Sequence, residues 1–211
     1  RIKGRVDSGD WEIVGGQVIE PDLNVPSGES LVRQSLYGQL YFRDNYGQTA
    51  EIGWVPDVFG FNYNMPQILQ KSGMNYFLTT KLNWNDTNKF PYEAFNWKAP
   101  DGSEVLTYKP THDYSINGSS LNQSNVSRTM DYPSAKGYSD SILLYGSGDH
   151  GGGPNNTDLT NLKNINSKSD APNVVFDTTM NAFEKIEDKA DTLPTVDDEL
   201  YLEKHRGTLT S

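Results

Sequence analysis

Asp57 is the residue in this sequence whose type and position best suit chemistry at a carboxylate. It follows a largely apolar run, residues 49–55, that is short enough for a buried strand. A helix opened by Pro66 and closed by Gly73 is expected shortly after it. Asp57 would therefore stand where a strand ends and a loop begins, a position suited to meeting a ligand. The alternative is that Asp57 only caps the turn that follows.

The residues next to Asp57 indicate a rigid and partly aromatic setting. Trp54 and Phe59 would form a wall beside the carboxylate. Pro56 precedes Asp57 and Gly60 follows the loop, which suggests a backbone held in one shape. A catalytic carboxylate needs such a fixed position, because small misplacements of a reacting group cost rate.

Asp149 is a second acid that comes just after a predicted buried strand, residues 140–146. The glycines at 151–153 would let the backbone approach a ligand closely. A glycine-rich loop often indicates phosphate binding, but no lysine follows this one and the chain is acidic. We therefore exclude a phosphate-binding loop of the P-loop type.

The elements that would position these acids alternate between strands and helices, which indicates βα units and a parallel sheet. Residues 96–108 are typical of a hairpin with a Pro-Asp-Gly turn, and residues 111–136 of a long loop or excursion. Further strands are expected at 11–20, 49–55, 75–80, 140–146, 172–176 and 199–205, and helices at 1–9, 27–41, 65–73, 158–165 and 178–189.

Composition is that of a globular protein without disulfides. The 211 residues are 35% hydrophobic and 11% aromatic, enough for one sizeable core. A formal net charge of −10 argues against a nucleic-acid partner, and no apolar run approaches membrane-spanning length. The absence of cysteine excludes thiolate metal sites. We expect a cytoplasmic location, and we also expect both ends to be cut from a longer chain.

Six stretches of the sequence, in order along the chain, carry a resemblance to a known family. The longest is WVPDVFGFNYNMPQIL at 54–69. The others are WEIVGG at 11–16 with EPDLN at 20–24, PSGESLVRQ at 26–34, FLTTKLNWN at 77–85, GSGDHGGGP at 146–154 and ELYLEKHRGT at 199–208. Together they resemble the alpha-mannosidases of glycoside hydrolase family 38.

The resemblance implies a retaining alpha-mannosidase that hydrolyses terminal alpha-linked mannose from glycans. Retaining cleavage uses two carboxyl groups about 5 to 5.5 Å apart, one as nucleophile and one as acid and then base. Asp57 matches the family's nucleophile, which is also a ligand of a Zn²⁺ ion (or another divalent cation) that orients the sugar.

The remaining metal ligands of the family do not match this sequence. The family uses a His-x-Asp pair and a further histidine, whereas His112, His150 and His205 do not stand in a His-x-Asp pattern. We expect the other ligands to lie outside this chain, because one carboxylate cannot hold zinc tightly. The chain alone is therefore expected to be weak or inactive as an enzyme.

The general acid is placed at Glu203 by aligning the C-terminal motif with the family. The alternatives are that Glu203 is a solvent-facing residue of an alternating strand, and that Asp149 is the acid. For Trp84 a packing role, and for His150 a loop role, compete with sugar contact. The residues expected to bind substrate are Trp54, Phe59, Lys81, Trp84, Asp149, His150, His205 and Arg206.

For the fold, the resemblance implies an α/β structure, part of a seven-stranded β/α barrel with a mostly parallel sheet. Residues 1–211 would be the central and C-terminal part of one catalytic domain. The expected partner is a mannose-containing oligosaccharide, and the oligomeric state is left open. The competing hypotheses are a non-catalytic carbohydrate-binding or structural fragment and a metal-dependent polysaccharide deacetylase, whose Asp-Asp and His-x-x-x-His pattern is missing.

Overall fold

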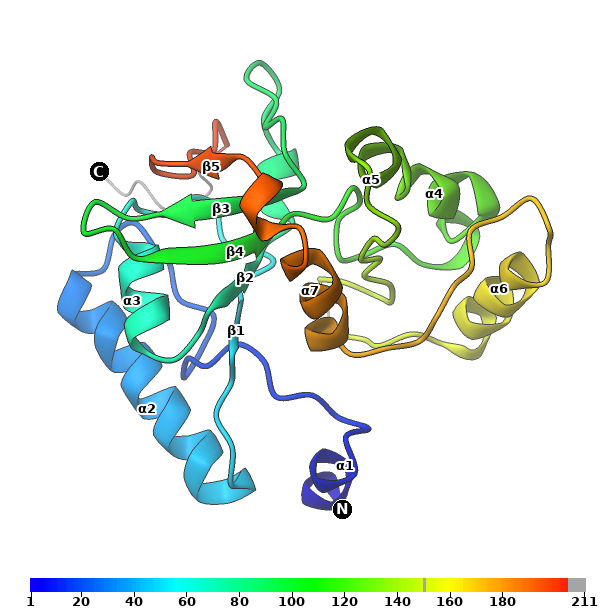
Figure 1. Ribbon diagram of the computed structural model, residues 1–211. Helices are drawn as coiled ribbons and strands as arrows, with labels where there is room; N and C mark the ends of the chain where they lie inside the picture. The colour runs from blue at the N-terminus through cyan, green and yellow to red at the C-terminus, as the bar shows by residue number, and fades with distance from the viewer. Residues whose placement is uncertain (150, 205–211) are drawn as a thin grey trace. The chain divides into compact units, whose positions relative to one another are not determined.

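The computed structural model describes residues 1–149 and 151–204 (Figure 1). The chain divides into two compact units. Unit 1 is built from Arg1–Lys109 together with Glu187–Ser211, and unit 2 is Pro110–Ile186. The expectation that all of these residues belong to one catalytic domain stays a prediction.

A five-stranded mixed sheet forms the centre of unit 1, with the strand order β1-β2-β4-β3-β5. Neighbouring strands are parallel except β3 and β4, which form the antiparallel hairpin that the Pro-Asp-Gly turn predicts. Gly102 supplies the left-handed conformation of that turn, with φ at 88°. The strands are β1 (Ile52–Trp54), β2 (Tyr76–Leu78), β3 (Ala94–Lys98), β4 (Glu104–Tyr108) and β5 (Thr195–Val196).

Two helices of unit 1, α2 and α3, begin at the predicted signals, and α2 runs beyond its expected end to Tyr46. Ser27 caps α2 by accepting from the backbone N–H of Ser30, and a proline stands in the first turn of α3. α2 packs against α3, and α3 covers β3 and β4 (Figure 1). The helices are α1 (Ile2–Asp7), α2 (Gly28–Tyr46) and α3 (Met65–Lys71), with the short 3-10 turns η1 (Lys81–Asn83) and η3 (Ala190–Thr192).

A buried glutamine ties α2 to the rest of unit 1. The side-chain amide of Gln39 donates to the carbonyl oxygens of Ala50 and Ser72, at 2.7 and 3.0 Å. Its oxygen accepts from the backbone N–H of Ala50 at 2.9 Å. These bonds satisfy the polar groups of a side chain that is otherwise out of water, and so fix the chain entering β1 against α2.

The core of unit 1 is aromatic where the sheet meets the loop after Asp57. Phe61 packs edge-on against Phe77 of β2, with ring centroids 5.5 Å apart, and Phe77 packs against Trp97 of β3. All three side chains are at most 1% exposed. Two leucines of the C-terminal segment, Leu200 and Leu202, belong to the same core.

Unit 2 is made of short helices and irregular chain, and has its own small core. Residues 111–136, expected as a loop or excursion, contain two of its helices and a 3-10 turn. The core joins Val126 of α4 to Leu162 and Ile165 of α6. The elements are η2 (Gly118–Ser120), α4 (Gln123–Arg128), α5 (Asp131–Lys136), α6 (Asn156–Asn166) and α7 (Thr179–Glu187).

Four predicted strands are wrong within the described residues: 11–20, 140–146, 172–176 and 199–204 are irregular there. Gly15 and Gly16 both have positive φ, which interrupts the first of these segments. Leu200 forms only an isolated bridge with Phe61. An apolar or alternating pattern shows that a segment can face a core, but a strand also needs a neighbour with which to pair. The structure therefore shows an α/β fold with a mostly parallel sheet, and the seven-stranded barrel stays a prediction.

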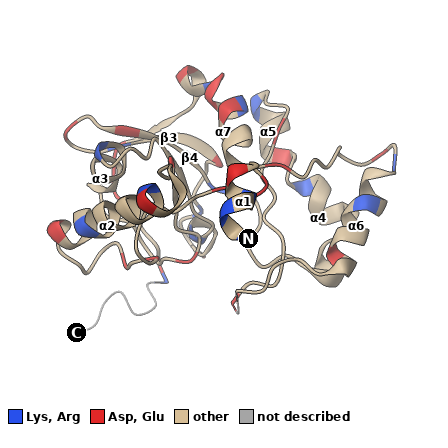
Figure 2. Ribbon diagram, turned by 90° about the horizontal axis from the view of Figure 1, so that it is seen from below, with Lys and Arg blue, Asp and Glu red and all other residues tan. Residues whose placement is uncertain are grey.

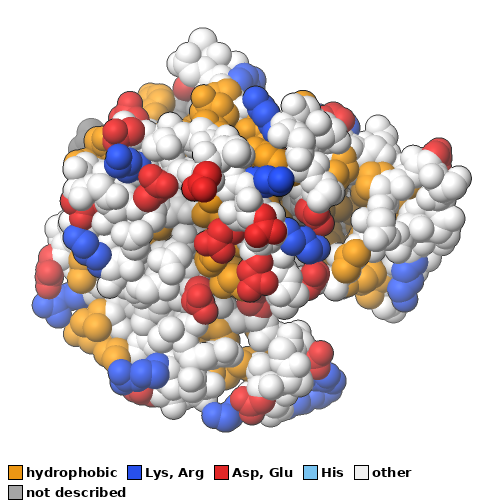
Figure 3. All heavy atoms as spheres, in the orientation of Figure 1, with side chains coloured by type: hydrophobic (Ala, Val, Ile, Leu, Met, Phe, Trp, Pro, Cys, Tyr) orange, Lys and Arg blue, Asp and Glu red, His pale blue; other side chains and the backbone are white. Residues whose placement is uncertain are grey.

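Charged residues of both signs are distributed along the described part of the chain (Figure 2). On the face drawn in Figure 3, lysines and arginines are scattered among acidic, uncharged and hydrophobic side chains. None of the helices in the described part of the chain combines the length and apolar character that a membrane crossing requires.

A close approach of α2 to the chain before it, at Gly38, yields a stability prediction. A Cβ on Gly38 would lie 2.5 Å from the carbonyl carbon of Gln17 and 2.5 Å from the oxygen of Gly16. In Gly38→Ala, a helix-propensity gain of about 1 kcal/mol opposes a backbone displacement that costs about 1 to 3 kcal/mol. We expect the displacement to dominate and the free energy of unfolding in urea to fall.

Gly4→Ala is the matched control, because nothing lies within 4 Å of a Cβ at Gly4 in α1. This variant should be as stable as the parent chain or slightly more stable. Equal or greater stability in Gly38→Ala would show that α2 does not contact residues 16–17 as described.

Candidate functional site at the carboxyl edge of the sheet

Three parallel strands of unit 1 end at the same edge of the sheet, and each is followed by a charged residue. Asp57 follows β1, Lys81 follows β2 and Lys109 follows β4. The order β1-β2-β4 makes these strands neighbours. In open α/β sheets, ligands bind outside the carboxyl ends of the strands, so this edge is the natural place for a site.

Asp57 is bound to Lys81 by a short ion pair. Nζ of Lys81 lies 2.6 Å from Oδ1 of Asp57, and the two side chains are 2% and 44% exposed. The lysine is thus buried, while its carboxylate partner faces solvent. This geometry confirms that Asp57 is not a core residue, and it leaves part of the carboxylate open to a ligand.

Aromatic rings enclose the ammonium group of Lys81. Nζ lies 3.9 Å from the ring centroid of Trp84 and 5.0 Å from that of Phe59. The two rings meet edge-to-face, with centroids 5.5 Å apart. Cation–π attraction and the Asp57 carboxylate together compensate a buried charge that would otherwise be costly. Phe59, expected beside the carboxylate, and Trp84 therefore both lie at the ammonium group that binds Asp57. Both rings also pack against the core, and a contact of Trp84 with sugar stays a prediction.

The loops after β1 and β2 are tied to each other. Oγ1 of Thr80 donates to the carbonyl oxygen of Pro56 at 2.8 Å, and the backbone N–H of Val55 donates to the carbonyl oxygen of Leu78 at 3.0 Å. Both bonds join residues that come shortly before the ion pair in the two segments. They hold the backbone around Asp57 in the fixed position that its neighbours Pro56 and Gly60 indicate.

Glu20 is a second carboxylate at this site. Its Oε1 accepts from the backbone N–H of Asp57 at 2.7 Å. Partial removal from water raises the pKa of Glu20 above its ordinary value, and the negative charge of Asp57 acts in the same direction. The hydrogen bond from the Asp57 backbone and the charge of Lys81 oppose the rise.

The carboxylate of Glu203 is held by the backbone of another loop. Its oxygens accept from the N–H groups of Asp86, Thr87 and Asn88 at 2.7, 2.9 and 2.6 Å. The hydrogen bonds from Thr87 and Asn88 lower the pKa of Glu203 below its ordinary value. A carboxylate stabilised as the anion in this way is poorly suited to donate a proton.

Asn85 completes the connection between the two segments. Its side-chain nitrogen donates to the carbonyl oxygen of Tyr201, and its side-chain oxygen accepts from the backbone N–H of Glu203. Lys204 adds an ion pair to Asp86 at 3.0 Å. Residues 201–204 are thus attached to the loop that directly follows Trp84.

The remaining predicted site residues lie elsewhere or outside the described residues. Trp54 is the half-buried last residue of β1. Asp149 belongs to unit 2, is exposed, has a positive φ of 47° and accepts a hydrogen bond from the hydroxyl of Tyr114 at 3.0 Å. His150, His205 and Arg206 are not among the described residues.

The described residues of this chain do not provide a complete metal site. No group of three or more histidine, aspartate or glutamate side chains that could hold an ion occurs in residues 1–149 and 151–204. At the sheet edge, one oxygen of Asp57 is bound to Lys81 and one oxygen of Glu20 accepts from the Asp57 backbone. Zinc sites need three or four ligands, so any such ion would require further ligands.

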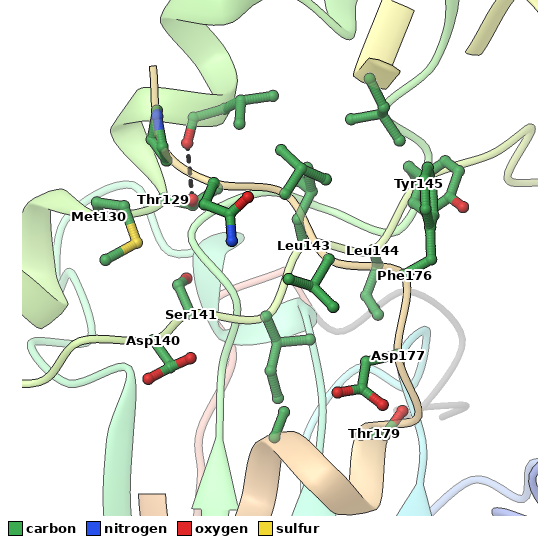
Figure 4. A pocket seen from close by; sticks show the side chains of 18 of the residues that line it. Thr129, Met130, Asp140, Ser141, Leu143, Leu144, Tyr145, Phe176, Asp177 and Thr179 are labelled. Carbon is green, nitrogen blue, oxygen red and sulfur yellow. Dashed lines mark hydrogen bonds between the residues drawn. The ribbon is translucent and has the colours of Figure 1, made fainter. Parts of the chain in front are cut away.

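Unit 2 contains a cavity of about 220 Å³ that does not include the predicted site residues. Figure 4 shows side chains that line it, among them Asp140, Asp177, Leu143, Leu144, Tyr145 and Phe176. Asp140 is paired with Lys185 at 3.3 Å, and Asp177 accepts from the backbone N–H of Thr178. The carboxylates of Asp140 and Asp177 are thus engaged with a lysine and with the backbone.

Sequence reasoning missed Glu20, Asn83 and Lys109 at the sheet edge. Glu20 lies far from Asp57 in the sequence, and only its place in a family motif marks it. Lys109 directly follows the predicted second strand of the hairpin, just as Lys81 follows β2. That position was a usable signal, but it depends on knowing that β4, and not β3, pairs with β2.

Comparison with known proteins identifies the family. The family model described as "Glycosyl hydrolases family 38 N-terminal domain" matches residues 1–199. The chain is 38% identical over 220 residues to "Alpha-mannosidase" of Saccharomyces cerevisiae, covering 98% of this chain and 20% of that protein. It is 39% identical over 213 residues to "Alpha-mannosidase 2C1" of Homo sapiens, covering 100% of this chain and 20% of that protein.

A solved structure shares the fold. The crystal structure of an alpha-mannosidase from Enterococcus faecalis V583 superimposes with a TM-score of 0.67 at 22% identity, over 94% of this chain and 23% of that one. The chain spans about a fifth of the length of the curated relatives it matches. Because the family model matches nearly all of the chain and the two relatives cover 98% and 100% of it, the chain belongs to glycosyl hydrolases family 38, as part of that family's N-terminal domain.

Proposed function

We propose that the full-length protein is a retaining alpha-mannosidase and that this chain supplies its nucleophile, Asp57. The observation that carries the proposal is the position of Asp57: a half-exposed carboxylate at the carboxyl edge of a parallel sheet, fixed by a buried lysine. Membership of family 38 and the printed names of the relatives support the same reaction. The substrate would be a mannose-containing oligosaccharide, and the cytoplasmic location stays a prediction.

In this proposal an oxygen of Asp57 attacks the anomeric carbon of the terminal mannose as the glycosidic bond breaks. A general acid donates its proton to the leaving oxygen, and a covalent mannosyl-enzyme forms. The same acid, now a carboxylate, then takes a proton from water, which attacks the anomeric carbon and releases Asp57. Mannose leaves with its original configuration.

Lys81 serves this chemistry by orienting Asp57 while it contacts only one of the two carboxylate oxygens. Its ammonium contacts Oδ1 at 2.6 Å, so the other oxygen remains available to the sugar. The rings of Trp84 and Phe59 would offer an apolar surface to a pyranose on the same side, with Trp54 at the end of β1 nearby in sequence. Asp149, His150, His205 and Arg206 remain proposed sugar contacts.

For the general acid, the geometry favours Asp149 over Glu203. Three backbone N–H groups hold Glu203 as an anion, and its pKa is lowered. Asp149 is exposed and sits in a backbone conformation that non-glycine residues seldom adopt, as is common at functional sites.

We further infer that a Zn²⁺ ion, or another divalent cation, would use Asp57 with ligands from outside this chain. Such an ion would supply Lewis-acid and orienting chemistry to the sugar hydroxyls. The fold belongs to the same proposal: the five described strands would be part of a seven-stranded β/α barrel that the rest of the protein completes.

The nucleophile is tested with Asp57→Asn in the full-length protein, assayed on an aryl alpha-mannoside. We expect kcat to fall on the order of 10⁴-fold or more, because an amide cannot form the covalent intermediate. Asp44→Asn, which alters an exposed carboxylate of α2, should keep parental activity.

A nucleophile also has a signature that a structural aspartate lacks. In Asp57→Ala, added azide should restore turnover and give a mannosyl azide of inverted configuration, since the small anion replaces the missing carboxylate. Parental activity in Asp57→Asn, or no azide product from a folded Asp57→Ala, would reject Asp57 as nucleophile.

Asp149→Asn and Glu203→Gln, made separately, distinguish the two acids. Loss of the acid should lower the rate of hydrolysis roughly 10²- to 10⁴-fold on an alkyl mannoside, whose leaving group needs a proton. The rate on a dinitrophenyl mannoside should fall far less, because that leaving group needs no proton. We expect this pattern for Asp149→Asn. Glu203→Gln should instead lower the melting temperature and show no dependence on the leaving group. The reverse result would restore Glu203 as the acid.

Metal analysis after dialysis tests where the other ligands lie. We expect residues 1–211 alone to take up no stoichiometric Zn²⁺, and the full-length protein to hold about one ion per chain through several ligands. Full-length Asp57→Asn should hold zinc more weakly. Stoichiometric zinc in the isolated chain, lost in its own Asp57→Asn variant, would mean that this chain contains a complete site.

A further inference from the structure

Lys109 is a second buried lysine at the sheet edge, and the reaction proposed above does not use it. Its side chain is 6% exposed and directly follows β4. Burial lowers the pKa of Lys109 below its ordinary value, and the negative charge of Glu93 opposes that shift. A leucine or methionine could fill the same space without the desolvation cost of a charge, so packing alone does not account for a lysine here.

The ammonium group of Lys109 is directed at the turn that carries Lys81. Nζ donates to Oδ1 of Asn83 at 2.8 Å. Asn83 is the last residue of η1, and Lys81 is the first. The backbone N–H of Lys109 also donates to the carbonyl oxygen of Glu93, which fixes the lysine at the end of the β3–β4 hairpin.

A single 3-10 turn is held weakly by its own backbone. In η1 and its cap, the backbone N–H of Asn83 donates to the carbonyl oxygen of Thr80, and the backbone N–H of Trp84 donates to the carbonyl oxygen of Lys81. Such short turns have poor hydrogen-bond geometry and rely on outside contacts for their position. A charge-assisted bond from a rigid strand end is a strong contact of this kind.

Three contacts therefore lead from Lys109 to the proposed nucleophile. Lys109 binds Asn83, the η1 backbone joins Asn83 to Lys81, and Lys81 binds Oδ1 of Asp57 at 2.6 Å. Through Trp84, the residue that follows η1, the same turn also sets the ring that lies 3.9 Å from the Lys81 ammonium. All of these residues belong to unit 1.

We propose that Lys109 is a positioning residue that, through Asn83 and the η1 turn, holds Lys81 in the orientation that aligns Asp57 for attack. This inference rests on the proposed function. Lys109 itself would not touch the sugar. Because it acts on the alignment of a reacting group and not on substrate affinity, its loss should appear in kcat more than in KM.

The test uses the full-length protein with Lys109→Met, Asn83→Ala and the double variant, assayed on an aryl alpha-mannoside beside the parent. Lys71→Met is the control. Lys71 is the last residue of α3, and its side chain is 63% exposed and pairs with Asp101. We expect kcat to fall roughly 10- to 100-fold in each single variant, with KM within about 2-fold of the parent.

Non-additivity and rescue separate positioning from general destabilisation. If Lys109 acts through Asn83, the double variant should lose no more activity than the worse single variant. Asn83→Asp keeps an acceptor for the ammonium and should retain more of kcat than Asn83→Ala. Should Lys109→Met fail to fold, the comparison of Asn83→Ala with Asn83→Asp still tests the positioning role, because Asn83 is only half-buried.

The results that contradict the positioning role differ from those that contradict the proposed function. Parental kcat in a folded Lys109→Met or in Asn83→Ala would overturn the positioning role while leaving the mannosidase proposal intact. Losses that multiply in the double variant would also overturn it. A parent protein without alpha-mannosidase activity would instead overturn the proposed function, and this inference with it.

Discussion

The ion pair between Lys81 and Asp57 is the constraint on which the site depends. An ammonium group that is 2% exposed needs compensation, and here a carboxylate and two aromatic rings provide it. The same contact determines where the Asp57 carboxylate lies. The loops after β1 and β2 must therefore close on each other for the lysine to be buried, and the hydrogen bond from Thr80 to Pro56 shows that they do.

The sequence predicted the parts of the fold that have local signals. Ser27 before α2, the proline at the start of α3 and the Pro-Asp-Gly turn of the hairpin each act within a few residues, and the elements form where they indicate. Segments 140–146 and 172–176 have apolar patterns but no strand neighbours in the structure. Pairing depends on distant residues, so a local pattern cannot establish it.

The residues of the site also differ in whether a local signal in the sequence predicts them. Asp57 and Lys81 could be predicted because each comes shortly after a recognisable strand and stands in a family motif. Lys109 also follows a predicted strand, but its place in the site depends on β4, and not β3, lying next to β2, and this order is not visible along the chain. Glu203 shows the limit of a motif alignment, which predicts a role in proton transfer but not the partners of the side chain, the backbone N–H groups of residues 86–88.

The buried amide of Asn85 has a consequence for covalent modification. Asn85 and Thr87 form an Asn-x-Thr acceptor sequence for N-linked glycans. Yet the side chain is 4% exposed, and both of its polar atoms bind the backbone of residues 201 and 203. The folded chain therefore cannot present this nitrogen to an oligosaccharide-transferring enzyme. A copy glycosylated before folding would lose the attachment of residues 201–204 to the loop after Trp84.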